Sequence, residues 1–231
     1  MHPPPGAPAR FFQIGFPRCG TTALAAFFER SGIPCVHSDR GRLARRMREN
    51  MARGRPPLDG YERYRAFTNM DFIAADDFFD GFRHHRALDA AYGGRFILNT
   101  RPVEHWLRSF TAHNARRGPG VAAAHALARF GTADPARVAA GWRALWEEHH
   151  RRVKAELAPE RLLVFDIESD PPERLCDFAG LPRACARHWR LENPTMGPFG
   201  NTLARLAPRG LKRAIPERLR RAAKRGLRAR R

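Results

Sequence analysis

Residues 11–24 constrain the fold of this chain most, because a short apolar run leads there through a tight loop into the start of a helix. The stretch reads FFQIGFPRCGTTAL. Where a buried strand turns into a helix, free backbone N–H groups and the positive end of the helix dipole meet, and both attract anions. The sequence therefore predicts an anion-binding cradle in an α/β domain.

The cradle resembles a Walker A loop that lacks its lysine. Gly15 and Gly20 have the G-x-x-x-x-G spacing, but Thr21 stands where the lysine that contacts the β- and γ-phosphates is expected. The cation of the loop is Arg18 instead. An ordinary strand–turn–helix with a threonine cap is the simpler alternative, and the loop alone does not decide between the two.

The rest of the chain alternates between strand and helix patterns. Apolar runs predict further strands over 33–37, 64–69, 95–100 and 161–167, and helical patterns cover 21–30, 76–92, 103–114, 121–130, 135–157 and 171–180. This alternation predicts a mainly parallel sheet flanked by helices, in a three-layer fold like that of P-loop NTPases. The polar, Arg-rich residues 40–65 are expected to form either a mobile substrate segment or plain surface, and Asp76-Asp77 to cap the helix over 76–92.

Proline content and charge divide the chain into three predicted parts. Residues 1–9 are Pro-rich and predicted to be disordered, residues 10–200 to form the α/β domain, and residues 201–231 to form a basic helix or tail. The net charge is +19, and residues 205–231 contribute twelve basic residues against one acid. The segment 210–231 either binds an anionic membrane surface or another polyanion, or packs on the core with a solvated end.

The cysteine pattern and the N-terminus predict a cytoplasmic protein, with the basic tail allowing peripheral contact with the inner membrane surface. No C-x-x-C pair is present, so zinc and disulfide frameworks are poorly supported. Neither a signal-peptide pattern nor an apolar run of membrane-spanning length occurs in the sequence. The four cysteines are Cys19, Cys35, Cys176 and Cys185.

A second anion anchor follows the predicted strand 95–100. Arg101 stands at the end of that strand, and Ser109 follows eight residues later on the next helix. This spacing can bring a guanidinium fork and a hydroxyl to one side of a single phosphate. Each motif alone is a loose signal, but two motifs in this order, each at a strand-to-helix junction and about 80 residues apart, are a much stronger one.

These motifs resemble those of sulfotransferases that use 3′-phosphoadenosine 5′-phosphosulfate (PAPS). Residues 16–22 are similar to the loop of that family around the 5′-phosphosulfate, and Arg101 with Ser109 is similar to its 3′-phosphate anchor. Residues 161–178 resemble the last strand and helix of the family core. The resemblance covers residues 11–182 and is strongest to small bacterial members.

The resemblance implies PAPS as donor, 3′-phosphoadenosine 5′-phosphate (PAP) as product, and transfer without a metal ion. The implied donor-binding residues are Pro17, Arg18, Cys19, Gly20, Thr21, Thr22, Arg101 and Ser109. Arg18 occupies the place of the family's lysine and is expected to stabilise charge on the oxygen between sulfur and phosphorus. The general base is either Asp71 or His37, with Asp71 slightly favoured because it lies closer to the usual position of the family's base. Cys19 is either a reactive thiol at a helix N-terminus or, more simply, a small loop residue.

The acceptor is not specified by the sequence. The resemblance implies a hydroxyl or amine on a glycan, lipid or small metabolite, bound by residues within 38–75 and 112–140. The alternatives are a nucleotide kinase or other NTPase with a degenerate loop, and a nucleotide-binding protein that has the fold but no catalysis. The basic charge also suits a nucleic-acid-binding module, but no motif of that class is present, so no specific nucleic acid is expected.

Overall fold

A computed structural model describes residues 9–74, 77–116 and 119–190. The predicted tail over 201–231, and all but the last residue of the predicted Pro-rich segment 1–9, lie outside the described residues. One compact unit, residues 1–192, contains the described chain.

The centre of this unit is a parallel sheet of five strands in the order β2-β3-β1-β6-β7. The strands are β1 (Phe11–Gln13), β2 (Cys35–His37), β3 (Ala66–Thr68), β6 (Arg95–Thr100) and β7 (Leu162–Asp166). Each lies within a predicted strand and pairs in parallel with its neighbours. The predicted mainly parallel sheet is thus confirmed.

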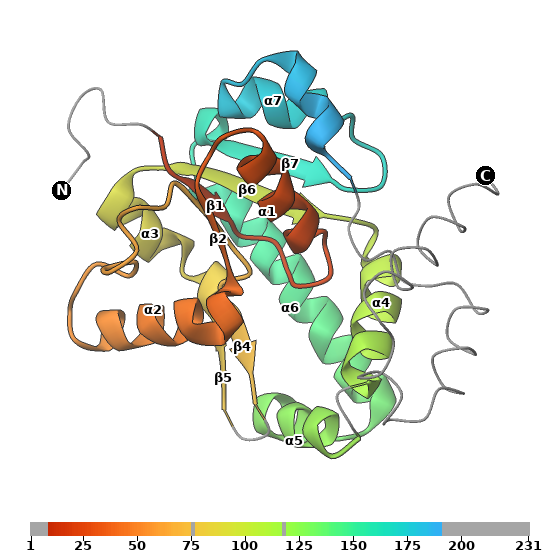
Figure 1. The fold of residues 1–231 in the computed structure, drawn as a ribbon. Coiled ribbons are helices and arrows are strands. Elements are labelled where there is room, and N and C mark those ends of the chain that lie inside the picture. The colour runs from red at the N-terminus through yellow and green to blue at the C-terminus, as the bar shows by residue number, and fades with distance from the viewer. Residues whose placement is uncertain (1–8, 75–76, 117–118, 191–231) are drawn as a thin grey trace, which may run out of the picture. The chain divides into compact units, whose positions relative to one another are not determined.

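Helices cover both faces of the sheet, because successive strand residues point to opposite faces. Phe11 and Ile97 pack against α1 (Thr21–Arg30) and α7 (Glu173–Ala179). Phe12, Phe96 and Leu98 pack on the opposite face, in a cluster with residues of α2 (Arg42–Ala52), α3 (His85–Tyr92) and α6 (Pro135–Glu156). The result is the predicted three-layer arrangement (Figure 1).

Two more helices, α4 (Val103–Ala115) and α5 (Pro119–Phe130), lie next to α6 in Figure 1. They agree with the predicted helices over 103–114 and 121–130. An aromatic cluster packs between the loop after β1 and these helices. Its members include Phe16, Trp106, Phe110, Trp142 and Trp146.

The segment 40–65, expected to be either a mobile substrate segment or plain surface, contains a helix in its first half. The helix α2 covers residues 42–52, and its apolar residues Leu43, Ala44 and Met47 are buried. These residues follow the i, i+1, i+4 spacing of a helical stripe, but five arginines within 42–53 hide the pattern in a composition-based reading. The segment is therefore an amphipathic helix with an arginine-rich outer face.

The predicted helix over 76–92 is wrong for its first half. Residues 78–80 form strand β5 (Phe78–Asp80), which pairs antiparallel with β4 (Asp71–Ile73), and η2 (Gly81–Arg83), a short 3-10 turn, precedes α3. Gly81 follows the strand and must be glycine, because an added Cβ there would lie 2.2 Å from the Met70 carbonyl oxygen. Asp77 is not a helix cap: it pairs with Arg48 at 2.6 Å, and Asp76 lies outside the described residues.

Candidate functional site

The loop after β1 lies at the edge of the sheet where parallel strands end. In open α/β sheets this edge, near the point where the strand order reverses, is where ligands bind. Here β1 has β3 on one side and β6 on the other, so residues 14–20 emerge between the ends of strands that lead to Asn69 and Arg101. The two predicted anchors are thus neighbours in the fold.

Side-chain donors bind the carbonyl oxygens of this loop from the interior of the protein. Four of these donors are neutral: Nε2 of His149 lies 2.7 Å from the Ile14 oxygen, Gln13 donates to Gly15 at 2.5 Å, the Trp106 indole donates to Pro17 at 2.9 Å, and the Asn99 amide donates to Cys19. Arg101 adds a longer contact of 3.4 Å to the Arg18 carbonyl oxygen. With these acceptors bound inside the protein, the loop presents N–H groups rather than carbonyl oxygens to a ligand.

Asn99 is the centre of this support. It is 1% exposed, and its Oδ1 accepts hydrogen bonds from the Gly15 N–H at 3.1 Å and from Gln13 Nε2 at 2.8 Å. Gly15 must be glycine, because an added Cβ would lie 2.0 Å from the Asn99 carbonyl oxygen. Two loop residues have left-handed backbone angles, Arg18 with φ 72° and Gly20 with φ 74°. For a non-glycine residue this conformation is strained, and such strain persists only where the surroundings enforce it.

The helix α1 begins directly after the loop without a capping side chain. Its N-cap residue is Gly20, so no side-chain oxygen occupies the N–H groups of the first turn. The Thr21 hydroxyl lies 3.4 Å from Asn69 Oδ1, and the Thr22 hydroxyl lies 3.4 Å from His37 Nε2. This N-terminus therefore retains its donors for an external anion.

Positive charge converges beside the loop. The Arg18 side chain reaches Ser109, with 3.4 Å between Nε and Oγ. The pKa of Arg18 is lowered by burial and by the neighbouring charges of Arg116 and Arg101. Positive charges that crowd one another in this way are stabilised by a bound anion. The structure thus brings together Arg18, Arg101 and Ser109, three of the predicted donor-binding residues.

The guanidinium of Arg101 is held by a carboxylate. Glu168, two residues after β7, pairs with Arg101 through one oxygen and with His105 Nδ1 at 2.6 Å through the other. The pKa of Glu168 is lowered by its hydrogen bonds to His105 and Arg101, which outweigh the opposing effect of burial. Nε of Arg101 is buried and has no hydrogen-bond partner among the described residues. An unsatisfied buried donor of this kind fits an acceptor that a ligand would supply.

His37 lies at the other side of the helix N-terminus. Its Nδ1 is 2.9 Å from the Thr68 hydroxyl, and burial lowers the pKa of the ring. The Thr68 hydroxyl also lies 3.5 Å from the Val36 carbonyl oxygen. If Thr68 donates to that carbonyl, Nδ1 carries the proton and Nε2, which faces Thr22, is the basic nitrogen.

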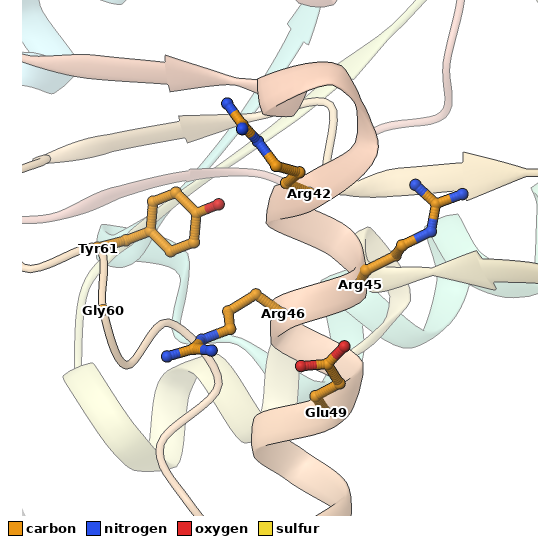
Figure 2. A pocket seen from close by; sticks show the side chains of 6 residues that line it. All are labelled: Arg42, Arg45, Arg46, Glu49, Gly60 and Tyr61. Atoms are coloured by element: carbon orange, nitrogen blue, oxygen red, sulfur yellow. The ribbon is translucent and has the colours of Figure 1, made fainter.

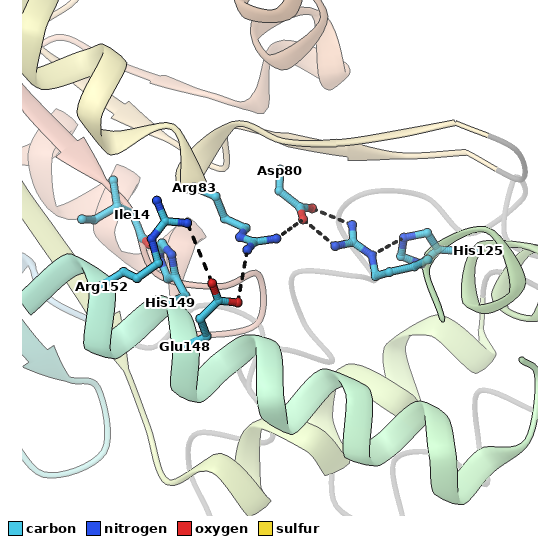
Figure 3. A network of polar contacts seen from close by, with 8 residues as sticks. Ile14, Asp80, Arg83, His125, Glu148, His149 and Arg152 are labelled. Atoms are coloured by element: carbon cyan, nitrogen blue, oxygen red, sulfur yellow. Dashed lines mark hydrogen bonds and ion pairs between the residues drawn. The ribbon is translucent and has the colours of Figure 1, made fainter. Parts of the chain in front are cut away.

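Asp71 follows β3 closely, as the sequence predicted. It begins β4, opposite Asp80 of β5, in a hairpin that contacts α2. The buried Arg129 of α5 anchors this hairpin: it binds Asp80 at 2.6 and 2.9 Å and stacks on Phe78 at 4.0 Å. Figure 3 shows how Asp80 connects this contact to Arg83 and α6. The hairpin that carries Asp71 is therefore held in place through Asp80, and His37 contacts the cradle at Thr22.

Cys19 is a structural residue of the loop. It is fully buried in the aromatic cluster, and burial strongly raises the pKa of its thiol. Thiolate chemistry at this position is thereby disfavoured, so the reading of Cys19 as a reactive thiol is wrong.

Metal-binding groups and membrane-spanning helices are both absent from the described residues. These residues contain no group of three or more His, Cys, Asp or Glu side chains placed to hold a metal ion. No helix among them is long and apolar enough to cross a membrane.

Five residues of the site were missed at the sequence level. They support the loop or hold its charged groups: Gln13, Asn69, Asn99, His149 and Glu168. Two carry a detectable signal, since Gln13 and Asn99 are polar residues inside strongly apolar strands, where an unpaired amide is costly. Asn69, His149 and Glu168 depend on contacts between distant segments, which no local pattern encodes.

Comparison with known families agrees with this geometry. A family model described as a sulfotransferase domain matches residues 10–187, which is most of the chain and nearly all of its described part. A search of curated proteins finds no match.

Proposed function

Because the chain belongs to the sulfotransferase domain family, we propose that it transfers a sulfuryl group from PAPS to a hydroxyl or amine of an acceptor. The observation that carries the choice of donor is the convergence of Arg18, Arg101 and Ser109 beside an uncapped helix N-terminus. PAPS has two separate phosphate positions, and the site offers two adjacent sets of anion donors. A triphosphate would instead require the lysine that this loop lacks.

The residues divide into two groups toward this donor. The backbone N–H groups of Gly20, Thr21 and Thr22 suit the 5′-phosphosulfate, since they lie at the helix N-terminus. Arg101 and Ser109 suit the 3′-phosphate, which would satisfy the unpartnered Nε of Arg101. Pro17 and Cys19 contribute through their backbone, because their carbonyl oxygens bind Trp106 and Asn99 and thereby fix the loop.

In the reaction, the acceptor oxygen or nitrogen attacks sulfur while the bond between sulfur and the 5′-phosphate oxygen breaks. The proton of the acceptor passes to a base, and the departing oxygen keeps the electron pair of the broken bond. Arg18 is the charged residue of the loop and would stabilise that growing negative charge, but as a permanent cation it would not protonate the oxygen. Its contact with Ser109, at 3.4 Å, supports a position next to both proposed phosphate sites.

His37 is the better candidate for the base on geometric grounds. It lies 3.4 Å from Thr22 at the helix N-terminus, and its lowered pKa keeps the ring neutral at pH 7. A neutral imidazole can accept the acceptor's proton directly. Asp71, on the hairpin, remains the second candidate.

The donor assignment is tested by binding. We expect PAP to raise the thermal midpoint and to bind at least about 30-fold more tightly than adenosine 5′-monophosphate, because a charge-assisted anchor contributes about 2 kcal/mol. Arg101→Ala should remove most of this difference. Arg108→Ala, which removes an exposed arginine from the following helix α4, is the matched control. Equal affinities for the two nucleotides in the unaltered protein would contradict the assignment.

Catalysis is tested separately by transfer of labelled sulfate from PAPS to a panel of acceptors. Arg18→Ala should reduce turnover by about 100-fold or more if Arg18 stabilises the departing oxygen. Binding of PAP without any sulfate transfer would instead favour a nucleotide-binding protein of this fold. Binding of Mg²⁺-ATP in preference to PAP would favour the degenerate NTPase.

A further inference from the structure

A pocket of about 400 Å³ lies along α2, on the side of the domain reached from the end of β2. It is lined by Arg42, Arg45, Arg46, Glu49, Gly60 and Tyr61 (Figure 2). Its volume falls within the range of small-molecule sites, about 300–1,000 Å³. Neither the family match nor the donor site described above accounts for it.

The arginines of this pocket differ in how they are paired. Arg42 is neutralised by Asp39 at 2.6 Å, and Tyr61 donates a hydrogen bond to the same carboxylate at 3.1 Å. Arg45 and Arg46 have no carboxylate within 4.0 Å among the described residues. Arg45 instead lies over the Phe72 ring, 4.6 Å from its centroid. Both are solvent-exposed, and the carboxylate that attracts Arg45 from a distance, Asp77, is already paired with Arg48.

One acidic side chain, Glu49, lies among the lining residues. It forms no ion pair with Arg45 or Arg46 in the described structure, although it is on the same helix. The lining therefore carries three positive charges and one negative charge. A pocket with this balance attracts an anionic group more strongly than a neutral group of the same shape.

A short turn, residues 38–41, connects the pocket to His37, the proposed base. Ser38, Asp39, Arg40 and Gly41 all have left-handed backbone angles, with φ of 58°, 46°, 57° and 81°. Asp39 within this turn binds both Arg42 and Tyr61 of the pocket. His37 precedes the turn and contacts Thr22. Five residue steps separate His37 from Arg42, so their Cα atoms lie at most about 18 Å apart.

We propose that this pocket binds an anionic group of the acceptor, such as a carboxylate, sulfate or phosphate, while the acceptor's nucleophile lies at His37. The proposal rests on the proposed sulfotransferase function and adds its substrate class. Arg45 and Arg46 supply the charge, and Arg42 and Tyr61, both fixed by Asp39, shape the wall. An acidic sugar and a small hydroxylated acid both have this chemistry, and the experiment separates them.

The test uses two pairs of probes that differ in charge. The first pair is a glucuronic-acid-terminated disaccharide and its glucose-terminated counterpart, and the second is 4-hydroxyphenylacetate and its neutral amide. Binding is measured by calorimetry on the full chain without donor. We expect one acid to bind at least about 10-fold more tightly than its neutral partner, because each charged hydrogen bond contributes on the order of 1.5 kcal/mol. The pair that shows the difference identifies the source of the anion.

The double variant Arg45→Ala/Arg46→Ala should abolish this preference. The control Arg53→Ala/Arg151→Ala removes the same charge from exposed positions outside the pocket and should retain it. Equal binding of acid and neutral partner in both pairs would overturn the proposal, and so would a preference that survives the double variant.

A parallel measurement of PAP affinity separates this proposal from the proposed function. The double variant should bind PAP as tightly as the unaltered chain, because neither arginine contacts the loop after β1 in the described structure. If PAP binds but no acid is preferred, the acceptor proposal alone fails. If PAP does not bind and an acid still depends on Arg45 and Arg46, the anion pocket stands and the sulfotransferase assignment fails.

Discussion

Two buried asparagines, Asn99 and Asn50, each hold a loop at one side of this domain, and they do so to different degrees. Asn99 uses both ends of its amide: Oδ1 accepts from Gly15 and Gln13, and Nδ2 donates to Cys19. Asn50, on α2, donates only from Nδ2, to the carbonyl oxygens of Pro57 and Asp59 at 3.1 and 3.0 Å. Its Oδ1 is buried without a partner among the described residues.

The difference separates two regions. The donor side, residues 14–20 with the proposed PAPS site, is shaped mostly by buried hydrogen bonds. The acceptor side, the pocket on α2 with the proposed acceptor site, is shaped mostly by exposed charge. Around residues 14–20 most of the supporting donors are neutral and inside the protein. Around the pocket on α2 the wall is held by the exposed ion pair Arg42–Asp39, a kind of contact that is weak in water and screened by salt. One side is therefore suited to a fixed ligand, and the other can tolerate variation in its ligand.

His37 joins the two sides, and its replacement should have the largest effect. We expect His37→Asn to lower kcat by about 100- to 10,000-fold, the range for loss of a general base, with little change in PAP affinity. Sulfate transfer from labelled PAPS measures the first quantity, and calorimetry measures the second. Asp71→Asn is the comparison variant. A loss in Asp71→Asn with full activity in His37→Asn would move the base to the hairpin.

Replacement of Asn99 tests whether the donor side depends on its buried amide. Asn99→Ala leaves the Gly15 N–H and the Cys19 carbonyl oxygen without their partner, so PAP affinity should fall about 100-fold, or about 2.7 kcal/mol. Asn50→Ala is the matched control: it should also destabilise the fold, by about 1–3 kcal/mol, but leave PAP affinity within about threefold. Urea unfolding and calorimetry on both variants give the two numbers. Similar losses of PAP affinity in the two variants would erase the distinction between the sides.

A smaller effect is expected from Glu168, which holds Arg101 on the donor side. Glu168→Gln keeps the size of the side chain but removes the charge that pairs with Arg101 and His105. If Glu168 mainly orients Arg101, KM for PAPS should rise about 10-fold with kcat nearly unchanged. If the carboxylate mainly competes with the 3′-phosphate, KM should fall instead. Steady-state kinetics distinguish these outcomes.

The sequence predicted the parts of the fold that depend on local pattern. Strands such as β6 and helices such as α4 follow from apolar runs and helical spacing, and their predicted bounds differ from the observed ones by at most one residue. The cradle and the pair Arg101 and Ser109 were found because each follows a strand directly. The differences from the structure lie where composition hides periodicity, as in α2, or where a hairpin interrupts a helical pattern, as at Phe78–Asp80.

The support of the cradle could not be predicted in the same way. His149 is separated from Ile14 by 135 residues, and Glu168 from Arg101 by 67. Which of several histidines or glutamates reaches the loop depends on how α6 and β7 pack against β1 and β6. The sequence predicts which residues would meet a ligand, and that remains a prediction, whereas the residues that hold them in place are visible only in the folded chain.

The smallest predicted effect is a pH dependence of stability that comes from buried histidines, among them His149 beside the loop after β1. Burial lowers the pKa of His149 from 6.5 to about 3, and burial also lowers that of His85. These histidines therefore bind protons near pH 6.5 in the unfolded chain but only at lower pH in the folded chain. The free energy of unfolding is thus greatest above pH 6.5 and falls as the pH drops toward 3. The slope reaches at most about 1.4 kcal/mol per pH unit for each histidine.

Urea unfolding at pH 7.5 and 5.5 should thus show a loss of about 1–2 kcal/mol in the unaltered protein. His149→Gln can still donate to the Ile14 carbonyl oxygen but cannot titrate, so its loss over the same interval should be about 1 kcal/mol smaller. The ion pairs of the acceptor side contribute nothing over this interval, because the pKa of Asp39 is lowered by its contact with Arg42 and lies well below pH 5.5. Asp39→Asn should therefore keep the full pH dependence. A steeper or unchanged dependence in His149→Gln would mean that the buried histidine of the donor side is not its source.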